Sequence, residues 1–235
     1  MQVVILAGGL ATRLRPLTHT TPKALIEVNG TPFLDLLLRR LREAGYDDVV
    51  LCIAHLGELI QNFVGDGSRW GLRVRYSNEG PTLRGTGGAL RAALPLLDET
   101  FLVTYGDSYL PFDYTSPLRT LIDHADCDSV MSVFLNRGAF DASNVRVRRD
   151  DKGDPWVDVY EKKTKDPAFE YIDYGALALR RSTLENYDES AIWGLESLQN
   201  TLSLQGRIRA VIAETRFYEI GTPEGLADFQ KYLEK

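Results

Sequence analysis

The stretch VVILAGGLATRL (Val3–Leu14) decides the fold, and the tripeptide TPK (Thr21–Lys23) follows it closely. A short apolar run that ends in two glycines predicts a buried strand followed by a tight turn. Without Cβ atoms, these glycines let backbone N–H groups approach a ligand and form an anion-binding nest. Arg13 adds a planar fork for phosphate oxygens, and Lys23 adds a compact charge. The stretch indicates a polyphosphate site, although a ligand-free turn with two solvated cations explains the same residues.

Strand-like and helix-like patterns alternate through the first half of the chain. Thr31 is the expected N-cap of a helix whose leucines recur at helical spacing and which Gly45 ends. The other predicted helices are Leu56–Val64 and Gly87–Leu97, and the predicted strands are Val3–Leu6, Val49–Ile53, Leu72–Tyr76 and Phe101–Thr104. This βαβαβ succession predicts a mainly parallel, doubly wound sheet.

The second half of the chain is less regular. A turn-rich segment, Asp150–Asp154, separates two alternating runs at Val145–Arg148 and Val157–Tyr160, which predicts a hairpin. A final helix is expected to begin at Thr222-Pro223. The remaining predicted strands are Val130–Leu135, Ile172–Leu179 and Ile208–Ile212. With no linker or repeat in the sequence, we expect one domain over residues 1–235 with an inserted, more exposed middle.

Composition narrows the class of protein. The net charge of −6 argues against nucleic-acid binding, and no apolar run approaches the roughly 20 residues of a membrane span. The short N-terminal apolar run lacks a charged region before it, so we interpret it as a strand and not a signal peptide. Cys52 and Cys127 are expected to be buried free thiols, which favours a cytoplasmic protein.

The segment AGGLATRLRPLT (Ala7–Thr18) together with Thr21–Lys23 resembles the signature of sugar-1-phosphate nucleotidyltransferases. The resemblance implies a Rossmann-like three-layer α/β/α sandwich with a mixed, mostly parallel central sheet and a sugar-binding insertion, placed here at residues 136–180. Ala11 stands where the pattern often has glycine, which predicts a slightly stiffer loop. The nucleotide-binding residues implied at this end of the chain are Leu6, Ala7, Gly8, Gly9, Thr12, Arg13 and Lys23.

Two later motifs extend the resemblance. GTGGA (Gly85–Ala89) resembles the family segment that lies against the nucleobase, which implies contacts from Gly85, Thr86 and Gly87. Simple capping of a helix also explains this glycine-rich start. Tyr105-Gly106-Asp107 follows a predicted buried strand and resembles the family's G-D motif, which implies that Asp107 is a metal ligand.

The remaining motifs concern the sugar and a second metal ligand. Glu161-Lys162 resembles the family's E-K pair, in which the lysine contacts the sugar phosphate and the glutamate a sugar hydroxyl. Asp173 and Gly175 occupy the region of the family's N-x-G sugar contact, with aspartate in place of asparagine. The segment FYEIGTPE (Phe217–Glu224) resembles F-x-D-I-G-T-P-E, so Glu219 stands where a metal-binding aspartate is usual.

The resemblance implies a reaction that joins a nucleoside triphosphate to a sugar 1-phosphate and releases pyrophosphate. A sugar-phosphate oxygen attacks the α-phosphorus in line, and positioning with charge neutralisation carries the rate. Arg13, Lys23 and Asp107 are therefore the predicted catalytic residues. Mg²⁺ is the expected cofactor, held by Asp107 and Glu219, because carboxylate oxygens suit this ion.

The glycine-rich segment at residues 85–88 and the tripeptide Gly106–Ser108 favour GTP and a heptose or mannose 1-phosphate, used for surface polysaccharide. A uridylyltransferase or thymidylyltransferase acting on a hexose or amino-sugar 1-phosphate is the alternative within the family, because the segments Gly65–Ser68 and Tyr76–Glu79 are also shared with uridylyltransferases acting on amino sugars. A non-catalytic nucleotide-sugar-binding regulatory subunit is the alternative of another class. A nicotinamide-dependent oxidoreductase is disfavoured because G-x-G-x-x-G is absent. Nucleic-acid and membrane partners are not expected, and homo-oligomerisation is left open.

Overall fold

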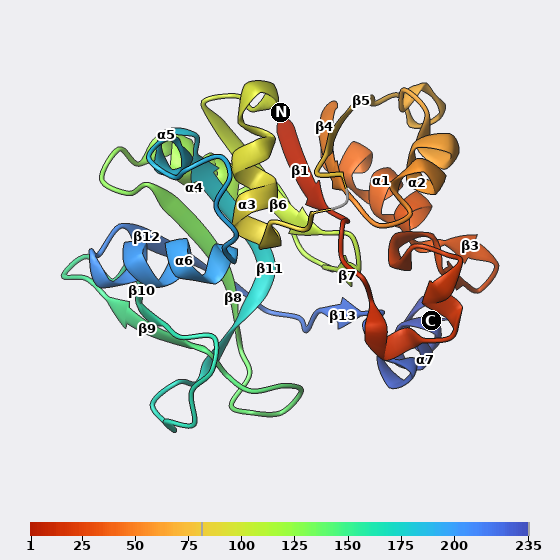
Figure 1. Cartoon of the computed structure of the whole chain (residues 1–235). Coiled ribbons are helices and arrows are strands. Elements are labelled where there is room, and N and C mark those ends of the chain that lie inside the picture. The colour runs from red at the N-terminus through yellow and green to blue at the C-terminus, as the bar shows by residue number, and fades with distance from the viewer. Residues whose placement is uncertain (81, 235) are drawn as a thin grey trace.

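The computed structural model describes residues 1–80 and 82–234, and within them a nine-stranded sheet runs in the order β5-β4-β1-β6-β11-β8-β12-β10-β9 (Figure 1). Its strands are β1 (Gln2–Leu6), β4 (Asp48–Ile53), β5 (Arg73–Asn78), β6 (Thr100–Tyr105), β8 (Ser129–Leu135), β9 (Val145–Arg149), β10 (Pro155–Tyr160), β11 (Tyr171–Arg180) and β12 (Ile208–Ala213). Two small ribbons pair β2 (Glu27–Val28) with β3 (Thr31–Pro32) and β7 (Ser108–Tyr109) with β13 (Tyr218–Glu219). The helices are α1 (Phe33–Glu43), α2 (Gly57–Val64), α3 (Gly85–Ala92), α4 (Ser116–Asp123), α5 (Ser182–Glu185), α6 (Leu195–Leu204) and α7 (Pro223–Leu233).

Strand β1 organises the parallel half of the sheet. It pairs in parallel with β4 on one side and with β6 on the other, and Leu6 is in register with both Cys52 and Tyr105. The alternating side chains of a strand point to opposite faces, so Val3 and Val4 enter two different apolar clusters. The first cluster includes apolar side chains of α1 and α4, and the second includes those of α3 and α6. Helices thus cover both faces, and three strands end at one edge.

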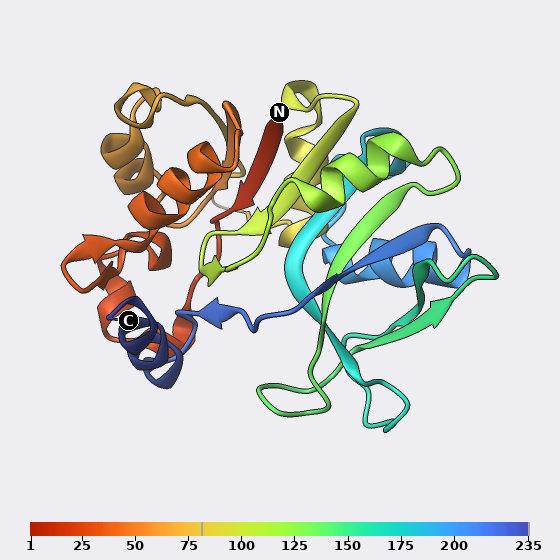
Figure 2. The ribbon, with the colours of Figure 1, turned by 180° about the vertical axis from the view of Figure 1, so that it is seen from behind.

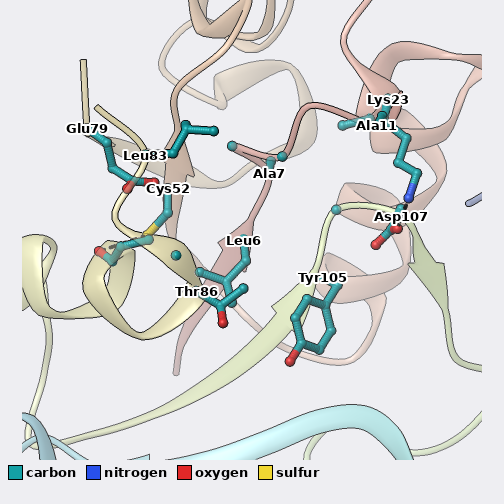
Figure 3. A pocket seen from close by; sticks show the side chains of 16 residues that line it. Leu6, Ala7, Ala11, Lys23, Cys52, Glu79, Leu83, Thr86, Tyr105 and Asp107 are labelled. Carbon is teal, nitrogen blue, oxygen red and sulfur yellow. Dashed lines mark hydrogen bonds and ion pairs between the residues drawn. The ribbon is translucent and has the colours of Figure 1, made fainter. Parts of the chain in front are cut away.

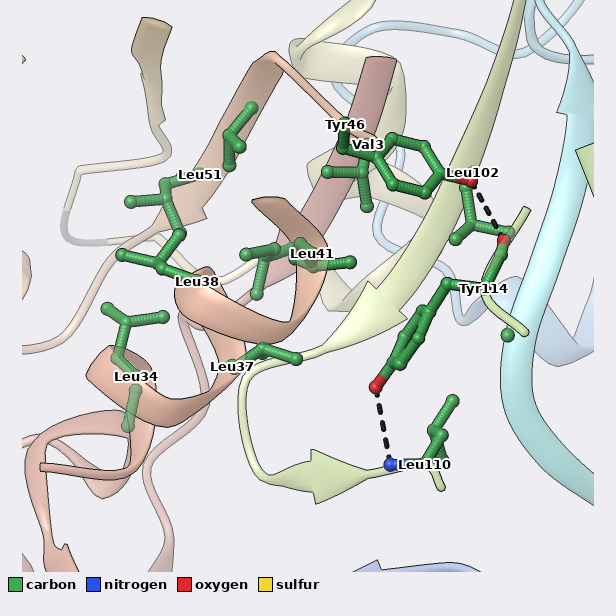
Figure 4. Close-up of a cluster of buried hydrophobic side chains, with 14 of the residues drawn as sticks. Val3, Leu34, Leu37, Leu38, Leu41, Tyr46, Leu51, Leu102, Leu110 and Tyr114 are labelled. Carbon is green, nitrogen blue, oxygen red and sulfur yellow. Dashed lines mark hydrogen bonds between the residues drawn. The ribbon is translucent and has the colours of Figure 1, made fainter. Parts of the chain in front are cut away.

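Figure 4 shows part of the first cluster, in which the leucines of α1 pack against β1 and β4. Two buried tyrosines add hydrogen bonds to this apolar packing. The Tyr46 hydroxyl donates to the backbone oxygen of Tyr114 at 2.9 Å, and the Tyr114 hydroxyl accepts from the backbone nitrogen of Leu110 at 3.2 Å. Because buried polar groups need partners, these bonds fix how α1 and the segment before α4 pack together.

The sheet is mixed, and its parallel character is more limited than the sequence predicts. β11 runs antiparallel to both of its main neighbours, β6 and β8, and the β9–β10 hairpin forms the far edge. Parallel pairing among the described strands is confined to β5-β4-β1-β6 and to β12 with β8. The hairpin returns the chain to the end of the sheet at which β6 finishes. β11 therefore begins at that end and runs antiparallel to β6. The expected insertion at residues 136–180 stays a prediction, but β11 within this range belongs to the main sheet.

Two predicted helix starts have different outcomes. The predicted start of α7 at Thr222-Pro223 is confirmed, and the Thr222 side chain caps the helix by accepting a hydrogen bond from the backbone nitrogen of Gly225 at 3.1 Å. The predicted cap at Thr31 is wrong, because Thr31 and Pro32 pair with β2 and α1 begins at Phe33 without a side-chain cap. Figure 2 shows α7 beside the early segment that carries β2 and β3, and the Asn29 side chain donates to the backbone oxygen of Gln230.

Both cysteines are buried and unpaired, as predicted. Burial raises the pKa of each thiol, since the thiolate would lose its hydration. Within the described residues, no helix combines the length and the apolar character that a membrane crossing requires.

Candidate functional site

A cavity of about 260 Å³ opens where β1 and β6 end, next to the glycine turn (Figure 3). Most of the residues predicted to bind the nucleotide line it, together with the predicted metal ligand that follows β6. These are Leu6, Ala7, Gly8, Gly9, Lys23, Gly85, Thr86 and Asp107. The parallel registers of β1, β4 and β6 explain this convergence, because the carboxyl ends of parallel strands meet at one edge.

The glycine turn continues the main-chain ladder past the end of β1. The Ala7 nitrogen donates to the Cys52 oxygen at 2.9 Å, and the Gly106 nitrogen donates to the Leu6 oxygen at 3.0 Å. A Cβ on Gly8 would lie 3.3 Å from an Oε1 atom of Glu79, so this glycine permits a close approach between two cavity walls. Ala11 adopts left-handed backbone angles with φ of 48°, which costs an alanine about 1 kcal/mol and explains why glycine is frequent there.

The predicted cations meet at Gly221. A Cβ placed on this glycine would lie 3.3 Å from Lys23 Nζ and 3.4 Å from Arg13 Nη2, although the two residues come from different turns. Lys23 also forms an ion pair with Asp107. Arg13 and Thr12 belong to a short 3-10 turn and do not line the cavity, but the Arg13 guanidinium lies beside its cationic wall.

Of the two predicted metal ligands, Glu219 lies on β13, and Asp107 lies in the turn just before β7, the strand that pairs with β13. Glu219 pairs with Ser108 of β7, the residue directly after Asp107, and the Ile220 backbone nitrogen donates to the backbone oxygen of Asp107 at 3.0 Å. Although Glu219 is exposed as a residue, protein atoms crowd its carboxyl group. This loss of hydration, and then the negative charge of Asp107, raise the pKa of Glu219 above its ordinary value. A divalent cation placed between two carboxylates that repel each other would offset this repulsion.

This donor set fits Mg²⁺. The ion binds few protein ligands, keeps several waters and takes its other oxygens from substrate phosphates. Among the described residues, no three or more His, Cys, Asp or Glu side chains gather into a metal-binding group. A pair of hard carboxylates next to a cationic wall therefore suits a metal that arrives with phosphate and not an all-protein cage.

Of the residues predicted to contact the sugar 1-phosphate, Asp173 and Gly175 lie near Tyr105 of the cavity wall, and Glu161 and Lys162 follow the end of β10. Lys162 Nζ forms an ion pair with Glu196 at 3.1 Å, and the neighbouring Glu161 is exposed. The Asp173 carboxylate accepts from the Gly175 nitrogen at 2.9 Å and from Gln199 Nε2 at 2.8 Å. Burial raises the pKa of Asp173.

Gly175 joins the two halves of the site. Its φ of 92° favours glycine, and its oxygen accepts from the Thr104 hydroxyl on β6 at 3.0 Å. A Cβ on Gly175 would lie 3.7 Å from the Tyr105 ring, which also lines the cavity. Because β11 runs antiparallel to β6, the predicted sugar-contacting residues Asp173 and Gly175 lie beside the carboxyl end of β6.

The motif at residues 85–88 has a packing role that the sequence alone leaves open. The Gly87 and Gly88 nitrogens both donate to the Trp193 oxygen, at 3.1 and 3.2 Å. A Cβ on Gly87 would lie 2.2 Å from the Trp193 ring, so only glycine fits. Gly85 and Thr86 line the cavity, whereas Gly87 faces Trp193; its predicted nucleotide contact stays a prediction.

Sequence reasoning missed several residues of the cavity wall, of which Glu79 is the most informative. Its carboxylate accepts from the Arg84 backbone nitrogen at 2.7 Å, and burial raises its pKa. The signal for it was a carboxylate three residues after the predicted strand Leu72–Tyr76, at the same sheet edge as the glycine turn. The other missed lining residues are Ala11, Ala24, Cys52, Leu83, Ala89, Tyr105 and Gly106.

The model of a protein family described as nucleotidyl transferase (NTP_transferase) matches residues 2–235. An N-acetylmuramate α-1-phosphate uridylyltransferase from Neisseria meningitidis is 42% identical over 121 residues, which cover 51% of this chain and 52% of that enzyme. This chain therefore spans about half the length of that relative. A D-glycero-α-D-manno-heptose 1-phosphate guanylyltransferase from Campylobacter jejuni is 25% identical over 97% of this chain and 98% of its own length.

Solved structures agree on the fold. The structure of HddC from Yersinia pseudotuberculosis complexed with GMP-PN superimposes with a TM-score of 0.76 at 24% identity, and covers 99% of both chains. A putative glucose-1-phosphate thymidylyltransferase from Bacillus anthracis gives a TM-score of 0.83 at 18% identity, over 99% of this chain and 94% of its own. The family match over nearly the whole chain, with the Rossmann-like α/β fold and mixed sheet of these structures, shows that the protein belongs to the nucleotidyl transferase family.

Proposed function

We propose that this protein transfers a nucleotidyl group from a nucleoside triphosphate to a sugar 1-phosphate and releases pyrophosphate. The observation that carries the proposal is the arrangement around Gly221. Lys23 and Arg13 lie within 3.4 Å of the built Cβ position there, and Lys23 pairs with Asp107 beside Glu219. Cations for phosphate and carboxylates for Mg²⁺ thus meet where the glycine turn offers its backbone N–H groups.

The residues have separate roles in this reaction. Both substrates are polyanions, so their approach costs electrostatic energy that the site must offset. Arg13 neutralises the departing pyrophosphate, Lys23 the nucleotide phosphates and Lys162 the incoming sugar phosphate. Asp107 and Glu219 would hold Mg²⁺, which supplies charge neutralisation and a template for the phosphates. The sugar phosphate is already ionised at neutral pH, so the reaction needs no general base.

Glu79 supports GTP as the favoured nucleotide. Guanine offers two adjacent N–H donors, which match the two oxygens of a carboxylate, whereas uracil and thymine offer one N–H between two carbonyl oxygens. In the cavity, Glu79 Oε2 accepts from the Arg84 nitrogen and Oε1 lies close to Gly8. A carboxylate oxygen accepts more than one hydrogen bond, so both oxygens remain able to receive a guanine. The uridylyl and thymidylyl alternatives would place a carbonyl against this carboxylate.

Asp173 bears on the sugar. Its carboxylate only accepts hydrogen bonds, whereas the asparagine of the family pattern both donates and accepts. Each of its two oxygens already accepts one hydrogen bond from the protein. The remaining lone pairs of its carboxylate therefore suit sugar hydroxyls. The product would be an activated sugar for surface polysaccharide.

A substrate matrix tests the proposal. GTP, UTP, dTTP and CTP are each combined with mannose, heptose, glucose and N-acetylglucosamine 1-phosphates in the presence of Mg²⁺, and pyrophosphate release is measured. We expect the highest rate with GTP and a mannose- or heptose-type sugar. No release from any pair would refute an enzyme and leave a nucleotide-sugar-binding role. Release that is fastest with UTP or dTTP would refute the base assignment alone.

Glu79→Gln sharpens the base assignment. Glutamine keeps an oxygen for the Arg84 nitrogen but replaces one acceptor by a donor. Since a hydrogen bond to a charged group contributes about 1.5–3 kcal/mol, the preference for GTP over UTP should fall by roughly 10- to 100-fold. Glu58→Gln on the exposed side of α2 is the matched control and should leave the preference unchanged. An unchanged preference in Glu79→Gln would show that other groups read the base.

A further inference from the structure

The segment Trp193–Glu196 connects the two halves of the proposed site. At one end it is bonded to the nucleotide-binding motif: the Trp193 oxygen accepts from Gly87 and Gly88, and the Trp193 nitrogen donates to the Arg84 oxygen at 2.9 Å. The Leu195 nitrogen donates to the Thr86 hydroxyl at 2.8 Å. Through these contacts, the start of α6 follows the position of the α3 start.

At its other end, the same segment reaches the sugar side. Glu196, in the first turn of α6, forms the ion pair with Lys162 at 3.1 Å. Farther along the helix, the Gln199 side chain donates to the Asp173 carboxylate, and the Asn200 side chain donates to the backbone oxygen of Tyr160 at 2.8 Å. The nucleotide motif, α6 and the sugar residues therefore form one continuous chain of contacts.

We propose that Glu196 is a positioning residue that holds Lys162 at the sugar-phosphate site, and that the segment Trp193–Glu196 ties this position to the nucleotide-binding motif. This inference rests on the proposed function. A lysine side chain has high rotamer freedom, and an anchor that fixes it in advance reduces the ordering cost when phosphate binds. The cost of the anchor is a negative charge near an incoming anion, so positioning and repulsion act in opposite directions.

The ion pair is not explained by stability. The Lys162 side chain is 56% exposed and that of Glu196 is 33% exposed, and pairs that water reaches to this degree contribute little to folding. The site nevertheless makes room for Glu196, because a Cβ on Gly194 would lie 2.2 Å from both of its carboxyl oxygens. Gly194 has extended backbone angles that any residue adopts, so its lack of a side chain serves the placement of Glu196.

Glu196→Gln separates positioning from repulsion by the sign of its effect. If Glu196 positions Lys162, kcat/KM for the sugar 1-phosphate should fall about 10-fold, mainly through KM, while nucleotide affinity in calorimetry and the melting temperature stay unchanged. If Glu196 only repels the phosphate, the same parameter should rise, which would overturn the proposal. Glu196→Asp keeps the charge and should recover part of the loss. Glu43→Gln removes another exposed ion pair, on α1, and serves as the matched control.

Gly194→Ala tests the same idea without changing a charge. The added methyl group must displace the Glu196 carboxylate, so this variant should reproduce the loss in kcat/KM for the sugar 1-phosphate. The double variant Gly194→Ala/Glu196→Gln should lose no more than either single variant, because both act through one contact. Additive losses would overturn the proposal. An inactive wild type would refute the proposed function together with this inference, whereas an active wild type with unaffected variants would refute the inference alone.

Discussion

Asp107→Asn tests the central assignment of the site. Asp107 follows the end of β6, forms the ion pair with Lys23 and lies beside Glu219. Asparagine has nearly the same size and keeps one oxygen toward Lys23, but it removes the charge that would bind Mg²⁺. The substitution therefore changes the electrostatics of the site and leaves its packing intact.

The expected effect of Asp107→Asn on turnover is much larger than its expected effect on stability. Loss of one preorganised electrostatic contact lowers turnover by roughly 10²–10³-fold, or about 2.7–4 kcal/mol. The effect on stability should be smaller, because the side chains of Lys23 and Asp107 are 17% and 25% exposed and asparagine still accepts a hydrogen bond. A charge-assisted bond that becomes a neutral one costs about 1 kcal/mol, or roughly 2–4 °C in Tm for a chain of this size.

The assay measures pyrophosphate release at saturating nucleotide and sugar 1-phosphate, and the Tm of the same preparations. Asp123→Asn on the exposed side of α4 is the control for loss of one negative charge. Near-native turnover in Asp107→Asn would refute the assignment of Asp107. A fall in Tm above about 10 °C would also refute the reasoning, because it would give Asp107 a structural role that the partly exposed ion pair does not support.

Three further predictions address other parts of the molecule. Gly221→Ala places a methyl group 3.3 Å from Lys23 Nζ and shifts that cation by a few tenths of an ångström; we expect a roughly 3- to 5-fold fall in kcat/KM for the nucleotide, measured by pyrophosphate release, and an unchanged rate would contradict it. Because burial raises the pKa of Asp173, the folded state binds this proton more tightly than the unfolded chain, and the stability that the proton contributes is lost as pH rises through the folded pKa. Asparagine does not titrate, so the Tm of Asp173→Asn minus the Tm of wild type should increase from pH 4 to pH 8. A difference that stays constant or shrinks would contradict this prediction. Tyr46→Phe removes the bond to the Tyr114 oxygen and should lower the free energy of unfolding in urea by about 1 kcal/mol with an unchanged slope, while activity persists; full stability would show that this bond contributes nothing.

The sequence predicted those parts of the fold that depend on local pattern. β1 ends at Leu6 and the cap of α7 forms at Thr222, because a buried apolar run and a Thr-Pro pair each act within a few residues. The hairpin of β9 and β10 also forms as predicted. The position and direction of β11 in the sheet could not be predicted from the sequence, because the apolar pattern of a strand is the same in parallel and antiparallel pairing. The predicted helix cap at Thr31 was wrong for a related reason, because Thr31 pairs with Val28 in a short ribbon.

The same distinction applies to the site. Gly8, Lys23 and Asp107 lie in motifs whose chemistry is visible in the sequence, and the structure brings them to one cavity. Glu79 and Glu196 lie outside those motifs, and only the register of β5 and the packing of α6 on α3 bring them near the ligand positions. Glu79 follows a strand at the sheet edge of the glycine turn, which is a weak local signal, whereas nothing in the sequence separates Glu196 from an exposed charge.

The pairing of β7 with β13 has a consequence for folding. Asp107 lies in the middle of the chain, Lys23 near its beginning and Glu219 near its end, so the reactive centre forms only after segments nearly 200 residues apart have met. Contacts of such long range form late, because loop closure costs entropy before any contact compensates for it. A refolding chain can therefore complete β1, β4 and β6 before the proposed metal site has formed. Recovery of catalysis would then report the last docking step, and circular dichroism the earlier ones.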